Sequence, residues 1–279
     1  MSRLLSSSAG KRTLDLSGIY PPITTPFNSD ETIAFDKLND NLRKWTKIGF
    51  AGFVVMGSNG EAALLTTPEK VRLTEAVKAA CQGNSEHLVI AGAGCESTQQ
   101  TIELCAQLAA AGADAALIVT PCAYKSAMTA TALTAHYRKA RFCGDEVVAD
   151  CSPLPTILYN VPANTGVELP AEVAVEMSTH PNCIGVKDSG GDIAKITRMV
   201  AETREQDFQA LSVKALELQA RLIAPNAAVT RGFGVAGLKY ALDRTGFFGG
   251  PVRSPLQPLS EQQKLAVEKA FINNGFSFV

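Results

Sequence analysis

The stretch GFVVMGSNGE (Gly52–Glu61) places an apolar run directly before a loop of glycine, hydroxyl and amide residues. The run from Gly52 to Met56 is apolar at every position and does not alternate, which is typical of a parallel strand buried on both faces. The two loop glycines allow a tight turn whose backbone N–H groups can converge on a carboxylate or phosphate. Most glycine-rich turns are only turns, so this stretch by itself indicates a fold element and not a function.

The same pattern of apolar run, glycine- or hydroxyl-rich loop and helix-length segment recurs along the chain. We expect strands within 18–27, 52–56, 87–91, 115–119, 156–159 and 184–187, with helices over 36–48, from 67, 97–111, 129–141, 170–179 and 193–204. Six such units predict an α/β fold with a parallel sheet covered by helices, of the (β/α)8 TIM-barrel type, whose active site lies at the strand ends. A doubly wound open sheet is the alternative, but the chain has no GxGxxG after its first strand and no GxxxxGK[ST] motif.

The predicted barrel is incomplete around strands seven and eight. Residues 208–211 predict a seventh strand, but Ser212 leads directly into a helical pattern over 215–223 and then into PNAAVTR (225–231). A strand–crossover–strand unit takes roughly 30 residues. We therefore expect an internal segment to be missing near 211–213.

The gap and the rest of the pattern lead to three expectations about the domain. Unclosed strand edges favour aggregation, and interior side chains such as Val54 and Ile118 are expected to lose their cover. Residues 14–250 are predicted to form the barrel domain, and 251–279 a C-terminal helical extension. Residues 140–147 are expected to form an additional surface loop.

A lysine ends the apolar run of IGVKDSGGD (Ile184–Asp192). Lys187 either extends to water, which is the commoner case, or is held in a dry pocket as an amine nucleophile towards a carbonyl. Tyr159 ends another run, where it either fills the barrel mouth or, as a phenol beside an amine, donates and accepts protons. Ser58 can pass a proton between hydroxyls, and Glu61 is expected to support its loop. Because strand ends share one face, Lys187, Tyr159 and Ser58 should converge.

The motifs GSNGE, VTPC, LYNVPANTG and GVKDSGGD together resemble those of the dihydrodipicolinate synthase and N-acetylneuraminate lyase family of class I aldolases. The resemblance extends from about Leu16 to Phe276. Within the family it is closer to the mitochondrial 4-hydroxy-2-oxoglutarate aldolases, through GIYPPITTPF, CESTQ, PNAAVTR and FGGP. It implies a Schiff-base lyase that cleaves 4-hydroxy-2-oxoglutarate to pyruvate and glyoxylate without metal or organic cofactor, as a homo-oligomer and, in the family, a tetramer.

The resemblance also implies a role for each matching residue. Lys187 would form the Schiff base with the small 2-oxo acid, and Tyr159 would donate and accept the proton. Ser58 would belong to the proton relay, and Ser58 and Asn59 would hold the pyruvyl carboxylate. Ser189 matches a residue that lines the pocket.

Two positions and the missing segment separate the chain from other members of the family. Asn164 stands where the synthase-type motif has an arginine for the aldehyde partner's carboxylate, which favours the aldolase over the synthase. Ala123 stands where the family has a further relay tyrosine, and Tyr124 next to it could take that place, although adjacent side chains of extended backbone point opposite ways. The missing segment and Ala123 keep a second hypothesis open, a catalytically impaired or silent isoform that associates with intact aldolase subunits. A phosphate-binding barrel enzyme would need a glycine-rich loop after strands seven and eight, where this chain is short.

Composition excludes several other classes of function. The 279 residues are 46% hydrophobic and 19% charged, with a formal net charge of -1, which predicts no nucleic-acid or anionic-membrane partner. No apolar run approaches the roughly 18 residues of a membrane span. The seven scattered cysteines include no CxxC pair and are expected to be reduced, and the three histidines form no local metal motif. Residues 1–13 are basic, serine-rich and free of acids, so they predict either a mitochondrial transit segment or a disordered tail of a cytoplasmic protein.

Overall fold

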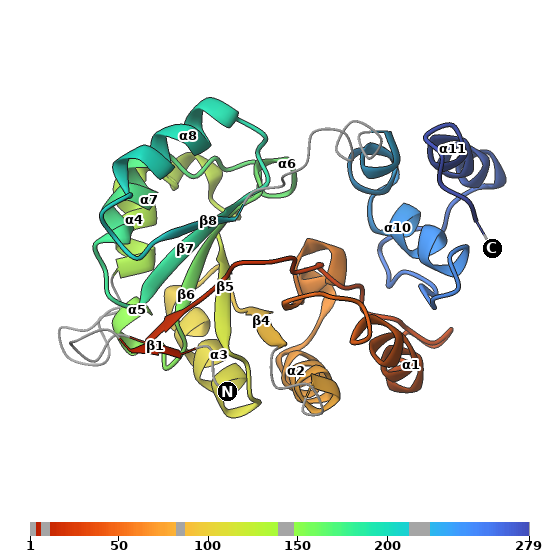
Figure 1. Ribbon diagram of the computed structural model, residues 1–279, viewed down its shortest axis with the longest axis horizontal. Helices are drawn as coiled ribbons and strands as arrows, with labels where there is room; N and C mark the ends of the chain where they lie inside the picture. Colours follow the sequence, from red (N-terminus) through yellow and green to blue (C-terminus); the bar gives the residue numbers. More distant parts are fainter. Residues whose placement is uncertain (1–3, 7–11, 82–86, 139–147, 212–223, 279) are drawn as a thin grey trace.

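A curved, parallel six-stranded sheet forms the centre of the protein, and helices cover its outer face (Figure 1). The computed structural model describes residues 4–6, 12–81, 87–138, 148–211 and 224–278. In sheet order, the strands are β3 (Gly52–Val55), β4 (Leu88–Gly92), β5 (Ala115–Val119), β6 (Thr156–Asn160), β7 (Cys183–Asp188) and β8 (Gln209–Leu211). The α-helices are α1 (Phe35–Trp45), α2 (Thr67–Cys81), α3 (Thr98–Ala110), α4 (Ala130–Arg138), α5 (Val148–Cys151), α6 (Pro162–Thr165), α7 (Ala171–Ser178), α8 (Ile193–Glu202), α10 (Gly234–Asp243) and α11 (Glu261–Ile272).

Short elements complete the description. An antiparallel pair joins β1 (Leu4–Ser6) to β2 (Arg12–Leu14). Three 3-10 turns, η1 (Ser58–Gly60), η2 (Ala62–Leu64) and η3 (Lys125–Ala127), and the π-helical turn η4 (Ala228–Gly232) lie in the connections. The alternation of strand and helix predicted from residue 36 to 211 is thus confirmed, with element ends shifted by a few residues. None of the helices in the part of the chain that the structure describes has the length and apolar character needed to cross a membrane.

The first predicted strand, within 18–27, does not form a regular strand. It pairs with β3 through a single parallel bridge between Pro22 and Val54. The N–H of Ile23 donates to the Val54 carbonyl at 3.0 Å, and the N–H of Val54 donates to the Pro21 carbonyl at 3.0 Å. Two consecutive prolines supply no N–H donors, so a continuous ladder cannot form here.

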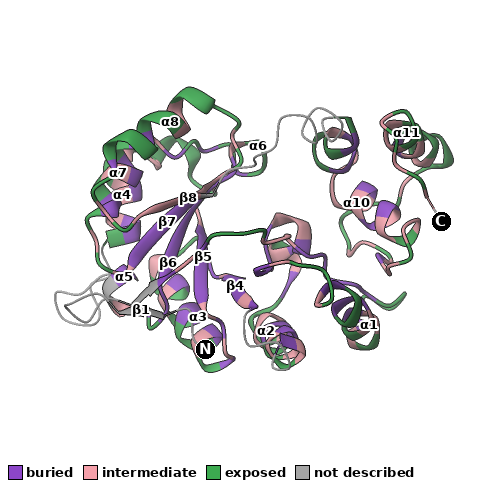
Figure 2. Ribbon diagram, in the orientation of Figure 1, coloured by how far each residue is buried: buried purple, intermediate pink, exposed green. Residues whose placement is uncertain are grey.

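Both faces of the sheet are buried, which explains the continuous apolar runs (Figure 2). Successive residues face opposite sides, so Val55 packs under the outer helices while Val54 faces the concave side. Leu14 and Leu16 pack against that concave side, where the chain crosses the sheet after β2 (Figure 1). The expectation that Val54 and Ile118 lose their cover was wrong, since they are only 2% and 1% exposed. The Leu14–Leu16 segment covers the concave side, and Ile118 belongs to the outer cluster beneath the helices.

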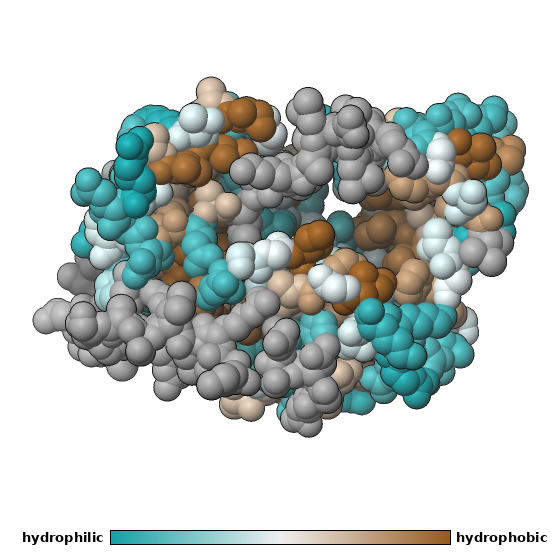
Figure 3. Space-filling model, in the orientation of Figure 1, coloured by the Kyte–Doolittle hydropathy of each residue, from teal (hydrophilic) through white to brown (hydrophobic). Residues whose placement is uncertain are grey.

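The structure describes a half-barrel with six strands, not a closed barrel of eight. Residues 224–278 contain helical elements and no further strand of this sheet. The loop expected at 140–147 and the helix expected over 215–223 lie outside the described residues. In a complete barrel the next helix would pack beside α8; here apolar residues gather at the surface over α8 (Figure 3), where Ile193 and Val200 are 67% and 49% exposed.

The amide side chain of Gln209 ties the N-terminal segment to β8. Its Oε1 accepts a hydrogen bond from the Leu16 N–H at 2.8 Å, and its Nε2 donates to the Leu14 carbonyl at 2.7 Å. The two ends of the half-barrel sequence are therefore linked through one side chain. This link holds Leu14 and Leu16 against the concave face of the sheet.

We predict that Gln209→Ala lowers the free energy of unfolding by about 1–2 kcal/mol, because it leaves a partly buried N–H and C=O without their partners. Urea unfolding followed by circular dichroism measures the change. Gln99→Ala is the matched control, since the exposed Gln99 side chain donates to the exposed Glu103, and its loss should change stability by less than about 0.5 kcal/mol. Equal stability of the Gln209 and Gln99 variants would show that the two hydrogen bonds of Gln209 contribute nothing to the free energy of unfolding.

The C-terminal region packs against the start of the half-barrel. Its own small core contains Val229, Ala241 and Val267. Asn41 of α1, 1% exposed, donates to the Phe248 carbonyl at 2.7 Å and accepts from the Phe248 N–H at 2.9 Å. These contacts fix the FGGP motif against α1. Helix α11 lies within the extension predicted over 251–279.

Candidate active site

Lys187 and Tyr159 lie side by side at the ends of β7 and β6. The strand register pairs the two residues directly, and paired residues of parallel strands point to the same face. The Lys187 Nζ lies 3.7 Å from the centroid of the Tyr159 ring. Tyr159 belongs to the concave-side cluster and is 6% exposed. The amine is therefore held over the phenol at the mouth of the half-barrel.

A β-bulge in β7 aims Lys187 at this face. Thr156 pairs with Cys183, but the next residue, Ile157, pairs with Gly185, so one residue of β7 has no counterpart on β6. Cys183 packs with the outer cluster and Ile184 with the concave one. After the extra residue the alternation changes phase, and Lys187 faces Tyr159; with unbroken alternation from Cys183 it would face the helices.

Ser58, at the start of η1, completes a contact with Tyr159. The Ser58 Oγ lies 3.4 Å from the Tyr159 phenol oxygen, although the two residues are far apart in sequence. The predicted convergence of Lys187, Tyr159 and Ser58 is confirmed. Burial would raise the pKa of the Tyr159 phenol, but the charge of Lys187 and polar contacts with Ser58, Lys187 and Ser189 outweigh it and hold the pKa below its ordinary value. The phenol is thus prepared to give up its proton.

The KDSGG loop is fixed by the residues that follow Lys187. The Lys187 Nζ donates to the Ser189 Oγ at 3.3 Å, so Ser189 lies beside the amine. Asp188 accepts hydrogen bonds from the Asn160 amide at 2.8 Å and from the Gly190 N–H at 2.8 Å. Asp188 therefore links the loop to β6 through Asn160 and to the loop's own backbone at Gly190.

Lys195 is a second lysine close to Lys187 in sequence, and two carboxylates hold its ammonium. Its Nζ lies 2.7 Å from the Asp188 carboxylate and also pairs with Glu168. Burial would lower the pKa of Lys195, but hydrogen bonds and charge from Asp188 and Glu168 hold it above the ordinary value. The Lys195 ammonium is held by two carboxylates, whereas Lys187 lies beside a hydroxyl and a phenol, and the phenol can take up its proton before the amine attacks a carbonyl.

Glu61 supports the GSNGE loop, as the sequence predicts. Its side chain is 0% exposed and lies 2.5 Å from the Lys239 Nζ, and its Oε2 accepts a hydrogen bond from the Arg253 N–H at 3.0 Å. The Glu61 backbone is left-handed, with φ 56°. Such a conformation costs a residue other than glycine about 1–2 kcal/mol, so surrounding contacts must hold it. Sequence reasoning missed Lys239, because no local pattern links α10 to this loop.

Glu96 of the CESTQ motif holds the loop after β5. Its carboxylate accepts hydrogen bonds from the backbone N–H groups of Cys122 at 2.9 Å and Ala123 at 2.8 Å, and from the Cys122 thiol at 3.2 Å. Burial would raise the pKa of Glu96, but these donors hold it below the ordinary value. Tyr124 is 78% exposed, so it lies in solvent and does not take the place of the relay tyrosine within this chain.

Two further predicted residues lie on neighbouring loops. Asn59 follows Ser58 in η1 and is half-buried. Asn164 lies on α6, directly after β6, and is exposed. Their proposed contacts with substrate carboxylates stay predictions.

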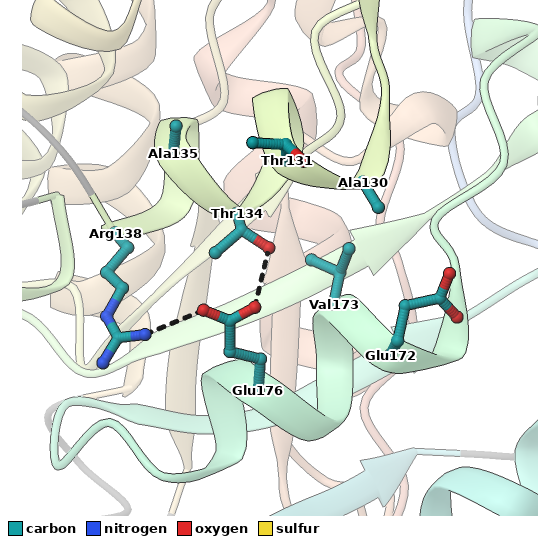
Figure 4. Close-up of a pocket in the computed structure, with 8 residues that line it drawn as sticks. All are labelled: Ala130, Thr131, Thr134, Ala135, Arg138, Glu172, Val173 and Glu176. Carbon is teal, nitrogen blue, oxygen red and sulfur yellow. Dashed lines mark hydrogen bonds and ion pairs between the residues drawn. The ribbon is translucent and has the colours of Figure 1, made fainter.

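A shallow groove on the outer surface is not the site. It runs between α4 and α7 (Figure 4), where Glu176 pairs with Arg138 at 2.8 Å and accepts from Thr134 at 3.3 Å. These helices cover the outer face of the sheet, whereas Lys187 and Tyr159 lie at the strand ends on the concave side. The groove also offers no amine close to a phenol.

Comparison with known proteins agrees with this architecture. The model of the Dihydrodipicolinate synthetase family matches residues 15–212. A probable mitochondrial 4-hydroxy-2-oxoglutarate aldolase of Emericella nidulans is 38% identical over 188 residues, 66% of this chain and 58% of that protein. An uncharacterised DapA-like lyase of Halobacterium salinarum is 31% identical over 301 aligned residues, 94% of this chain and 95% of that protein. The chloride-inhibited dihydrodipicolinate synthase of Acinetobacter baumannii, complexed with pyruvate, superposes with a TM-score of 0.81 at 26% identity, covering 93% of this chain and 99% of that chain.

The fold is that of a family whose members are class I, Schiff-base-forming lyases. The chain belongs to the dihydrodipicolinate synthetase family. It spans about three fifths of the length of the first curated relatives it matches, and several of these, 34–36% identical, are named 4-hydroxy-tetrahydrodipicolinate synthase. The family therefore does not by itself choose between the aldolase and the synthase.

Proposed function

We propose that this protein is a Schiff-base lyase that cleaves 4-hydroxy-2-oxoglutarate to pyruvate and glyoxylate through a Lys187 iminium. The observation that carries the proposal is the placement of the Lys187 amine 3.7 Å from the ring of a phenol whose pKa is lowered. An amine beside a proton acceptor is what carbinolamine formation and carbon–carbon cleavage both require. Borohydride trapping of the iminium, together with release of glyoxylate, tests it.

The steps follow from the positions of the three side chains. Tyr159 takes a proton from Lys187, whose neutral amine then adds to the C2 carbonyl of the substrate. Tyr159 gives this proton to the departing hydroxyl, which leaves as water, so that Lys187 becomes the cationic iminium and Tyr159 a phenolate. Tyr159, as phenolate, accepts the proton of the C4 hydroxyl; the C3–C4 bond breaks, glyoxylate leaves, and the electron pair moves into the iminium to give an enamine. Tyr159 returns the proton to C3, and water hydrolyses the iminium to release pyruvate and free Lys187. Ser58, 3.4 Å from the phenol oxygen, can carry the proton between Tyr159 and the substrate.

Asn164 supports the aldolase over the synthase. A guanidinium at this position would bind the carboxylate of aspartate semialdehyde, the aldehyde partner in the synthase reaction, by paired hydrogen bonds, and an amide cannot do so with comparable strength. Relatives with the aldolase name and relatives with the synthase name both match this chain, so the proposal relies on this position to choose between them. The preference for 4-hydroxy-2-oxoglutarate rests on it.

We predict that the natural chain does not condense pyruvate with aspartate semialdehyde, and that Asn164→Arg raises this condensation about tenfold or more above background, which corresponds to about 1.4 kcal/mol of added binding. Product formation followed by mass spectrometry measures both. Asn273→Arg, the same chemical change at the exposed end of α11, serves as the control. If Asn164→Arg changed no substrate's rate, this position would not set specificity.

A second candidate is a catalytically impaired isoform that associates with intact subunits. It is favoured by the 78% exposure of Tyr124 and by the family match, which ends at residue 212, just after β8. The alignment with the DapA-like lyase spans 301 positions against 279 residues, so this chain lacks residues that the relative has. These observations support the predicted internal gap near 211–213. An isoform of this kind would form the pyruvate adduct and release no glyoxylate.

Assembly and location complete the proposal. We infer a homo-oligomer, a tetramer by family resemblance, in which the exposed apolar residues of α8 are available for contact. The mitochondrial name of the Emericella nidulans relative and the basic, acid-free composition of residues 1–13 support a mitochondrial location.

A further inference from the structure

We propose that Lys239 of α10 is a positioning residue for the loop Gly57–Glu61, which it holds through a buried ion pair with Glu61. The inference rests on the proposed function in one respect, that this loop binds the pyruvyl carboxylate. Lys239 lies well beyond the last strand of the half-barrel in sequence. It would therefore make the C-terminal region part of the active-site architecture.

The Lys239–Glu61 pair lies at a junction of three chain segments. The two side chains are 1% and 0% exposed, and the Lys239 Nζ lies 2.5 Å from the Glu61 carboxylate. The same ammonium donates to the Pro251 carbonyl at 2.7 Å and lies 4.5 Å from the centroid of the Phe27 ring. One cation thus joins the first loop of the half-barrel, the GSNGE loop and the FGGP segment.

A continuous series of contacts leads from this pair to the reacting groups. The Glu61 backbone N–H donates to the Ser58 carbonyl at 3.2 Å, and the Gly60 N–H donates to the Gly57 carbonyl at 3.0 Å. The Ser58 hydroxyl in turn contacts the Tyr159 phenol at 3.4 Å. A movement of Glu61 would therefore move Ser58 relative to Tyr159.

The left-handed backbone of Glu61 makes the loop dependent on this support. Its φ of 56° is unfavourable for a residue with a Cβ and persists only where neighbouring contacts determine it. Without the ammonium, the Glu61 carboxylate would be a buried and uncompensated charge. The loop would then open to hydrate the carboxylate, and Ser58 would leave its position.

Hydrogen exchange tests this inference without reference to any reaction. In Lys239→Met, amide exchange in a peptide covering 57–65 should be about tenfold faster or more, while a peptide covering β5 keeps its rate. Lys264→Met, which removes a half-buried ammonium from α11, should leave both peptides unchanged. If Lys239→Met does not fold, Glu61→Gln replaces it, because this variant keeps the shape of the side chain and removes the carboxylate charge. Its exchange over 57–65 is again compared with exchange over β5. Unchanged exchange over 57–65 in a folded variant would overturn the inference.

The double variant separates the ion pair from a general packing role. Lys239→Met combined with Glu61→Gln leaves no buried unpaired charge, so exchange over 57–65 should be slower than in Lys239→Met alone. If the effects of the two single substitutions on exchange over 57–65 simply added in the double variant, the two residues would act independently, which would contradict the ion pair as the cause.

Pyruvate trapping connects the pair to the site. In Lys239→Met, the pyruvate concentration that gives half-maximal borohydride trapping should rise about tenfold, while the trapped amount at saturation stays within about twofold of the natural chain. An unchanged half-maximal concentration, with trapping intact in the natural chain, would contradict Lys239 as a positioning residue. Absence of trapping in the natural chain would contradict the proposed function, and the exchange result alone would then decide the inference.

Discussion

Lys187→Ala is expected to eliminate the covalent adduct that borohydride traps between this protein and pyruvate. Only an uncharged amine can condense with the carbonyl, and alanine supplies none. Lys195, the neighbouring lysine, is held as a cation by Asp188 at 2.7 Å and by Glu168, so it cannot replace Lys187. Intact mass spectrometry measures the adduct, and peptide mapping locates it.

The control for this experiment is Lys264→Ala, which removes a half-buried lysine of α11 and should leave the adduct unchanged. In the natural chain, the modified peptide should contain Lys187 and not Lys195. An adduct of normal yield in Lys187→Ala, or a modified peptide that carries Lys195, would show that the nucleophile has been assigned to the wrong residue.

Tyr159→Phe is expected to lower glyoxylate release about 10²–10⁴-fold, the usual contribution of a positioned general acid and base. The variant keeps the ring beneath the Lys187 ammonium, so the local packing is preserved. It removes the oxygen that contacts Ser58 and that accepts the proton of the C4 hydroxyl. Adduct formation with pyruvate should fall much less, because amine condensation demands less exact geometry than cleavage.

Tyr240→Phe is the matched control, since it also removes one hydroxyl, which there donates to Glu268 at 2.6 Å between α10 and α11. Its rate should remain close to that of the natural chain. A Tyr159→Phe variant that cleaves substrate as fast as the Tyr240→Phe variant would remove Tyr159 from the mechanism.

The strand–helix order could be predicted because each element carries a local signal. Uniformly apolar runs mark strands buried on both faces, and the glycine-rich loops after them mark the edge that holds the site. The signal failed at 18–27, where the tyrosine and isoleucine pattern suggested a strand but Pro21 and Pro22 remove the donors of a ladder. It also misplaced Ile118, because a uniformly apolar strand does not reveal which residues face inward.

The side chains that meet at the candidate site could be predicted from the sequence, but the features that hold them in position could not. Lys187, Tyr159 and Ser58 were placed together because their strands end at one edge. The bulge at Ile184 that turns Lys187 toward Tyr159 depends on the register with β6, which no single strand encodes. The partner of Glu61 depends on how the C-terminal region packs, so Lys239 became visible only in three dimensions.

The most direct test of the central claim is the amount of glyoxylate that the natural chain releases from 4-hydroxy-2-oxoglutarate, measured per mole of protein beside the yield of the Lys187 adduct. A Schiff-base lyase releases several equivalents of glyoxylate, and Lys187→Ala releases none. An adduct on Lys187 without release of glyoxylate would contradict the lyase and identify this chain as the impaired isoform.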